Sequence, residues 1–84
     1  MVPAQSRAAR GLLGWSQQQL AEAACIGIVT VRQFENNAAQ PRGATLDVMR
    51  RAFEAAGVVF VEENGEGPGV RLRKERVTES EQSW

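Results

Sequence analysis

The sequence predicts a mainly α-helical fold of four short helices followed by a C-terminal β-hairpin. Up to residue 57, apolar side chains recur at the three- and four-residue spacing of amphipathic helices. Beyond residue 57 the pattern changes to β-branched and alternating residues on either side of a glycine-rich turn. Within the helical part, residues 16–35 form two short periodic segments separated by very few residues. We therefore expect a helical domain at 1–57, a hairpin at 58–73 and a disordered, polar tail at 74–84.

The first helix is expected at residues 3–13. Pro3 suits the first turn of a helix, because the backbone nitrogen there has no partner within the helix. Ala9, Leu12 and Leu13 recur at helical spacing and are expected to face the core. Gly14 is expected to end the helix, since glycine permits the backbone conformation that closes a helix.

The second helix is expected to begin at Gln17. Ser16 can cap its start, and Gln19, three residues later, can return a hydrogen bond to the cap nitrogen. Trp15 and Leu20 stand at the positions of a hydrophobic staple. The apolar residues expected to face inward on this helix are Leu20, Ala21 and Ala24.

The third helix is expected at residues 28–36, after a turn of only three or four residues. So short a turn makes two helices cross steeply, which is the helix-turn-helix arrangement that places its second helix in the major groove of DNA. Ile26, Val31 and Phe34 continue the inward apolar surface. The residues then expected to project outward, toward base edges, are Ile28, Val29, Arg32 and Gln33.

The fourth helix is expected to follow a loop at 36–43, in which Asn37 suits a left-handed cap. Thr45 is its expected N-cap and Gly57 its end. The four-residue spacing predicts ion pairs between Asp47 and Arg51 and between Arg50 and Glu54. The apolar stripe expected to face the core consists of Leu46, Met49, Phe53 and Ala56.

The hairpin is expected to join strands at 58–62 and 70–73 around the turn at 63–69. An isolated hairpin is marginally stable in water, and four consecutive apolar residues would leave one face uncovered by the helices of a single copy. We therefore expect two hairpins to meet across a two-fold axis in a homodimer. Burial of both faces within one subunit is the alternative. The expected dimer residues are Val59, Phe60, Val61, Val70 and Leu72.

Composition limits the function classes. The chain has one cysteine and no histidine, so neither an intramolecular disulfide nor a metal site is expected. We find no catalytic constellation, cofactor motif or small-molecule site, and the glycines at 65, 67 and 69 fit a turn better than a nucleotide loop. No membrane span or secretory signal is evident, and a cytoplasmic location is expected. Cys25 is expected to be a small buried side chain and not a redox switch, and Trp84 to have no role.

The net charge of the helical part, and not that of the whole chain, is compatible with a nucleic-acid partner. The net formal charge is zero, but residues 1–57 hold six arginines against four acidic side chains, a net of +2. Affinity for DNA depends on the phosphates neutralised at the contact and not on the total charge. A surplus this small predicts weak non-specific binding by one copy, so a dimer is needed to hold a site.

Residues 8–57 resemble the Cro/C1-type helix-turn-helix regulators, which include the lambdoid phage repressors. The resemblance rests on Gly-Trp-Ser-Gln at 14–17, Leu-Ala at 20–21, Thr-Val-Arg at 30–32, Phe-Glu-Asn at 34–36, and the link from Pro41-Arg42 to Thr45-Leu46. It implies a four-helix, lambda-repressor-like domain. It also implies base contacts by Ile28, Val29, Arg32 and Gln33, phosphate contacts by Gln17, Asn36, Arg42 and Arg10, and a pair between Arg10 and Glu35.

Two features depart from the family pattern, the turn before the third helix and the first turn of that helix. Cys25 stands where glycine usually adopts a left-handed backbone, at a cost on the order of 1 kcal/mol, and Gly27 replaces the usual Ser or Thr cap. The turn before the third helix could therefore differ in shape from the turn of the family. Ile28 and Val29 are apolar where polar residues are usual, and apolar groups read thymine methyls without bidentate hydrogen bonds. Gln33 then suits adenine, and Arg32 suits guanine or a phosphate.

The sequence thus predicts a dimeric, sequence-specific transcriptional regulator of double-stranded DNA. We expect a repressor that covers a two-fold operator, with one helix at 28–36 in each of two major grooves about 34 Å apart. One alternative is a protein-binding adaptor or antiactivator that uses Ile28 and Val29 to sequester a regulator or toxin. An antitoxin that binds DNA and, through residues 74–84, a toxin is a further alternative.

Overall fold

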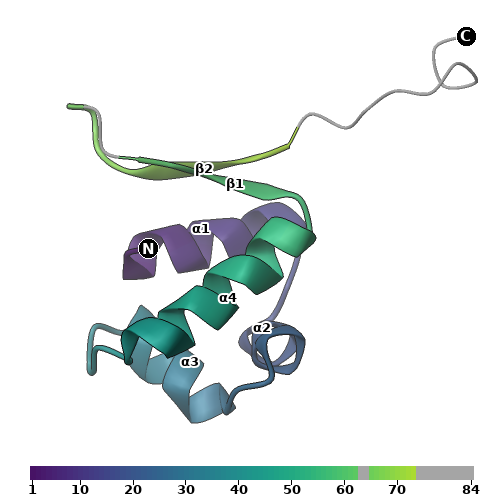
Figure 1. The fold of residues 1–84 in the computed structure, drawn as a ribbon, viewed down its shortest axis with the longest axis vertical. Coiled ribbons are helices and arrows are strands. Elements are labelled where there is room, and N and C mark those ends of the chain that lie inside the picture. The colour runs from purple at the N-terminus through teal and green to yellow at the C-terminus, as the bar shows by residue number, and fades with distance from the viewer. Residues whose placement is uncertain (63–64, 74–84) are drawn as a thin grey trace, which may run out of the picture.

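The computed structural model describes residues 1–62 and 65–73, and Figure 1 shows their arrangement. The predictions for the tail at 74–84, Trp84 included, lie outside the described residues. Four helices are followed by one antiparallel hairpin. The helices are α1 (Pro3–Leu13), α2 (Gln17–Ala24), α3 (Ile28–Glu35) and α4 (Gly43–Ala55), and the strands are β1 (Val58–Val61) and β2 (Gly69–Leu72). The hairpin lies over α1 and α4 at one end of the molecule, and α3 lies at the opposite end (Figure 1). The predicted mainly α fold with a terminal hairpin is confirmed.

Local sequence signals set the helix ends. Gly14 adopts φ +69° and closes α1, as predicted. The Ser16 hydroxyl accepts a hydrogen bond from the Gln19 N–H at 3.0 Å, and the Ser16 N–H donates to the Gln19 side chain at 2.8 Å. This reciprocal capping satisfies two backbone donors at the start of α2. Asn37 adopts φ +59°, the left-handed conformation expected of it.

The turn between α2 and α3 keeps the family shape in spite of its cysteine. Cys25 takes the left-handed conformation, φ +58° and ψ +43°, and its N–H donates to the carbonyls of Ala21 and Glu22. Because this backbone conformation ends α2 with the side chain in solvent, Cys25 is exposed, and the expectation of a buried thiol is wrong. Gly27 precedes α3 without a side-chain cap.

The core lies between the helices and the inner face of the hairpin. Phe53 stands at its centre, stacked on Trp15 with ring centroids 5.8 Å apart and edge-on to Phe60 at 6.0 Å. Such aromatic pairs add to the stabilisation by buried apolar area. The buried apolar residues are Ala9, Leu20, Ala21, Ala24, Val31, Phe34, Met49, Phe53, Val58 and Phe60.

Four expectations for α1 and α4 are wrong. Leu12 is 42% exposed, and Ala56 is exposed because α4 has already ended at the residue before it. Thr45 is not the cap: α4 begins two residues earlier, after Arg42, without a side-chain cap. Arg50 pairs with Glu54 at 3.1 Å as predicted, but the Asp47 and Arg51 side chains form no ion pair in the described structure.

The side chains of the hairpin divide between two faces. Val58 pairs with Leu72 and Phe60 with Val70, so these four side chains point to the same side of the ribbon, toward the helices. Val59 and Val61 point to the other side, together with Arg71. The predicted dimer set therefore mixes two faces, and Phe60, which is 8% exposed, belongs to the core of its own subunit.

Candidate nucleic-acid interface

The outward face of α3 is the exposed surface farthest from the hairpin (Figure 1). Val31 and Phe34 are turned into the core, so Val29, Arg32 and Gln33 must face solvent. Val29 is 56% exposed, which is high for a valine. Ile28 differs from the prediction, because it is half-buried and packs against the core. The helix therefore offers one apolar and two polar side chains to a partner.

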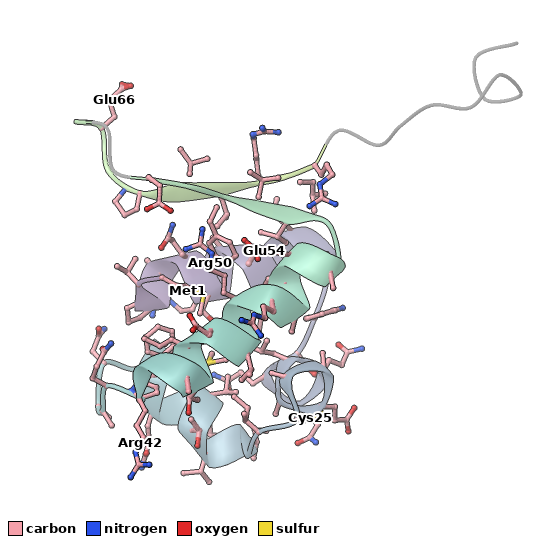
Figure 2. The ribbon with its side chains drawn as sticks, in the orientation of Figure 1. Met1, Cys25, Arg42, Arg50, Glu54 and Glu66 are labelled. Carbon is pink, nitrogen blue, oxygen red and sulfur yellow. The ribbon has the colours of Figure 1, made fainter. Side chains whose placement is uncertain are left out.

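Polar groups surround this face. Asn36 forms the C-cap of α3 and is exposed. Arg42, immediately before α4, is exposed, and Figure 2 shows it at the same end of the molecule as α3, pointing away from the hairpin. Gln17 opens α2, where the first N–H groups have no partner within the helix and suit a phosphate.

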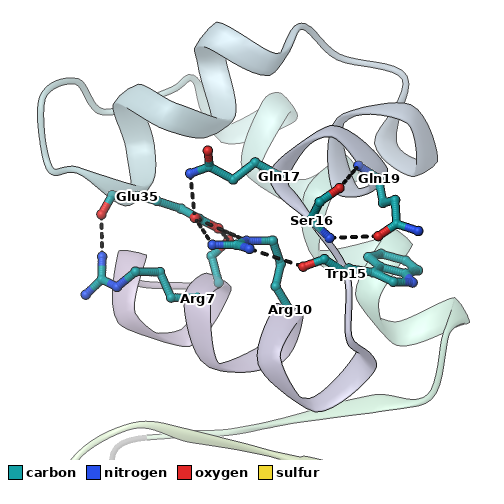
Figure 3. A network of polar contacts seen from close by, with 8 residues as sticks. Arg7, Arg10, Trp15, Ser16, Gln17, Gln19 and Glu35 are labelled. Atoms are coloured by element: carbon teal, nitrogen blue, oxygen red, sulfur yellow. Dashed lines mark hydrogen bonds and ion pairs between the residues drawn. The ribbon is translucent and has the colours of Figure 1, made fainter.

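The side chain of Glu35 holds the three helices of this region together (Figure 3). The residue is 2% exposed, and its carboxylate accepts hydrogen bonds from Ser6 at 2.6 Å, from Arg10 at 2.7 and 2.9 Å, and from Gln17 at 3.0 Å. The Arg7 guanidinium donates to the Glu35 backbone carbonyl. Since Ser6 and Arg10 lie on α1 and Gln17 on α2, the last residue of α3 is fixed to both other helices.

The electrostatics of this network keep both charges in place. Burial raises the pKa of the Glu35 carboxyl, but the hydrogen bonds from Arg10, Ser6 and Gln17 and the Arg10 charge outweigh it, so the pKa lies below its ordinary value. The hydrogen bond to Glu35 raises the pKa of the Arg10 guanidinium against the effect of burial. The pair is therefore ionised at neutral pH.

A comparison with known protein families decides the class of the domain. A family model described as helix-turn-helix, of the Cro/C1 type, matches residues 7–55. The chain belongs to the Cro/C1-type helix-turn-helix family. This is a non-enzymatic family of DNA-binding domains, of the kind found in transcriptional regulators. No curated protein matches the chain.

The Cro/C1-type domain exposes most of the predicted site residues at one end, but not Ile28, Gln17 or Arg10. Ile28 packs against the core, and the Gln17 side chain is half-buried and donates to Glu35. Val29, Arg32, Gln33, Asn36 and Arg42 are all exposed, whereas Arg10 is not available in the same way. Its Nε and Nη2 donate to Glu35 and its Nη1 donates to the Trp15 carbonyl at 3.1 Å. Arg10 thus positions the other helices from within, as its predicted pair with Glu35 implies, and this arrangement does not favour a phosphate contact.

Sequence reasoning missed two buried polar residues of α1. Ser6 is fully buried beside Glu35, and Gln5, 7% exposed, donates to the Gly69 carbonyl at 3.0 Å and to the Val61 carbonyl at 3.5 Å. The signal was present, because Gln5 lies four residues before buried Ala9, on the core-facing side of the helix. No described group of histidine, cysteine or acidic residues could hold a metal ion, and no described helix is long and apolar enough to cross a membrane.

Proposed function

We propose that this protein is a sequence-specific transcriptional regulator that acts as a homodimer on a two-fold operator. One α3 from each copy enters a major groove, with the two grooves about one helical turn, roughly 34 Å, apart. The observation that carries the proposal is the exposed face of α3, which the buried Glu35 network holds rigidly against α1 and α2. Rigid presentation of a reading helix lowers the ordering cost of binding.

The residues of this face have distinct roles in the proposal. Val29 packs against a thymine methyl, because an apolar side chain offers no hydrogen bond to a base edge. Gln33 suits bidentate contact with adenine, and Arg32 suits guanine or a phosphate. Contacts to the phosphate backbone by the Gln17 N–H and by the side chains of Asn36 and Arg42 set the orientation of the helix without reading sequence, while the Gln17 side chain stays bonded to Glu35.

We infer that the protein represses by steric exclusion. The described residues form one helical domain and one hairpin, and an operator that overlaps a promoter would be closed to polymerase by occupancy alone. The net charge of +2 over residues 1–57 supports only a modest attraction to phosphates. Joining two such domains through the hairpin raises affinity by making the second contact intramolecular.

Fluorescence anisotropy on the DNA that flanks the protein's own gene tests the proposal. We would compare this DNA with a scrambled sequence in about 50 to 200 mM salt and expect a preference of about 10³ or more. Replacing both Arg32 and Gln33 by alanine should remove most of that preference, at about 1–3 kcal/mol for each lost base contact. Arg51→Ala is the matched control, because Arg51 is exposed on α4, outside both α3 and the hairpin.

A protein-binding adaptor is the second candidate, and the 56% exposure of Val29 is the observation that favours it. Weak binding that is equal on the gene-flanking and the scrambled DNA, and that is lost as the salt concentration rises, would favour the adaptor over the regulator. In that case Val29→Asp should abolish binding to the protein partner, while the Arg32 and Gln33 substitutions should leave it intact. A regulator instead loses DNA binding with all three changes.

A further inference from the structure

Within residues 1–62 and 65–73, no further strand pairs with either edge of the hairpin, and the hydrogen-bond pattern shows which backbone groups line the two edges. The Arg73 N–H donates to the Gly57 carbonyl at 2.6 Å, which makes residues 57 and 73 a hydrogen-bonded pair. Such pairs alternate along an antiparallel ladder. The N–H and C=O groups of Val58 and Phe60 therefore point out along the edge of β1, and those of Val70 and Leu72 along the edge of β2.

The two edges differ in the side chains that flank them. The β1 edge is flanked by charges of α4: Arg50 pairs with Glu54 and also with Glu62, at 3.3 Å, and lies 5.0 Å from the Phe60 ring centroid. Charged side chains on an edge oppose pairing with another strand. These charged side chains therefore oppose the pairing of β1 with a strand of another molecule.

The edge of β2 is apolar. Figure 1 shows α1 running beneath the hairpin, from its turn toward the end of β2. Gln5 contacts the Gly69 carbonyl, and Leu12 lies two helical turns farther on the same face of α1, about 10 Å along, which brings it level with Leu72. Leu12 is 42% and Leu72 46% exposed, and exposed Ala8 lies beside them. We call Ala8, Leu12, Val70 and Leu72 the β2 flank.

We propose that the β2 flank is the surface on which a second copy of this chain docks, with β2 pairing antiparallel to β2 of the partner. The contact is self-complementary, as a two-fold interface requires, and it satisfies the outward backbone groups of Val70 and Leu72 in both copies. Strands in a sheet lie about 4.8 Å apart, so pairing also brings the two α1 helices close together. Ala4, Ala8 and Gly11, all exposed on α1, allow this approach.

Two further observations select edge pairing over stacking of the outer hairpin faces. The outer face carries Arg71, and the alternation places Arg73 there too, so two stacked copies would bring like charges together. Stacking would also direct the two α3 helices away from each other, because α3 lies at the opposite end from the hairpin. Edge pairing keeps both α3 helices on one side, as binding to a single operator requires; this last argument rests on the proposed function.

The test is carried out on the full chain without DNA. Sedimentation equilibrium gives the dimer dissociation constant, and hydrogen exchange gives amide protection at concentrations below and above it. Leu12→Glu and Leu72→Glu should each raise the dissociation constant about tenfold or more, because each buries an unpaired charge. Val48→Glu is the control, since Val48 is also an exposed apolar residue, 36% exposed, but lies on α4. Far-ultraviolet circular dichroism confirms that each variant is folded.

The expected result is a dimer in which the amides of Val70 and Leu72 gain protection with concentration, while those of Val58 and Phe60 do not. Three results would overturn the proposal: a monomer at several hundred micromolar, protection confined to the β1 edge, or a dimer weakened by Val59→Glu but not by Leu72→Glu. Concentration-independent protection of Val70 in a monomer would assign the edge to another segment of the same chain. DNA anisotropy on the same samples distinguishes failure of this interface from failure of the proposed function.

Discussion

Glu35→Gln is the most informative single substitution, because it keeps the shape of the side chain and removes only its charge. The wild-type carboxylate accepts hydrogen bonds from Ser6, Arg10 and Gln17 while 2% exposed. In the variant, one amide oxygen still accepts, but the amide nitrogen is placed against donors. The Arg10 guanidinium then keeps its positive charge without the carboxylate that balances it.

The size of the effect follows from burial. Removing one partner of a buried ion pair costs about 3–5 kcal/mol, but the Arg10 side chain is 20% exposed and can recover some hydration. We therefore expect the free energy of unfolding to fall by about 2–3 kcal/mol. In a domain of this size that loss corresponds to a decrease in Tm of about 10–20 °C.

The assay is urea and thermal unfolding followed by circular dichroism at 222 nm. Glu54→Gln is the matched control, because it removes the same charge from an exposed pair with Arg50 and should cost less than about 1 kcal/mol. If Glu35→Gln costs no more than this control, the network does not stabilise the helices and the reasoning is refuted.

The pH dependence gives an independent check with a definite sign. The folded-state pKa of Glu35 is lowered, so its stabilisation is fully present above the unfolded glutamate pKa of about 4.3 and is lost as the pH falls through the lower folded value. The stability difference between wild type and Glu35→Gln should be constant near neutral pH and should narrow below about pH 4. A gap that widens in acid would contradict the assigned charge state.

Three other predictions test separate features. Replacing the contacted operator thymine by uracil should weaken wild-type binding about fourfold for each methyl group lost, and Val29→Ala should bind both DNAs equally in the same anisotropy assay. Cys25→Gly should raise the free energy of unfolding by about 0.5 kcal/mol in urea titrations, because φ is +58° at this exposed position; a decrease would show that the left-handed turn is not strained. Ser16→Ala should lower it by about 1 kcal/mol through loss of the bond to the Gln19 N–H, and an unchanged midpoint would show that the cap contributes nothing.

The features predicted well from sequence are those fixed by neighbours along the chain. The cap at Ser16 and Gln19, the end of α1 at Gly14 and the inward positions of Val31 and Phe34 each depend on residues within one or two helical turns. The pair between Arg10 and Glu35 spans the domain, and family resemblance, not spacing, supplied it. Nearby residues along the chain were thus sufficient to predict these local features, whereas the contact between α1 and α3 was predicted only from the family resemblance.

The failures occur where packing in three dimensions decides. Leu12 has the spacing of a core residue, but it is 42% exposed, because no described element covers it. Gln5 is polar and yet buried, because its side-chain amide donates to the carbonyls of Val61 and Gly69. Phe60 belongs to a run of consecutive apolar residues, so the sequence pattern does not show which of them face the helices. The strand register places Phe60 on the face that packs on the core.

α1 links the two halves of the proposed function. One side of the helix carries Ser6 and Arg10, which hold Glu35 and thereby α3. A different side carries Gln5 and Leu12, of which the first is bonded to the hairpin and the second belongs to the β2 flank. Because a helix is stiff over three turns, the reading helix and the paired edge are held by one rigid element. A dimer built on this edge would therefore set the separation of its two α3 helices through α1 and not through a flexible linker, which favours one half-site spacing over several.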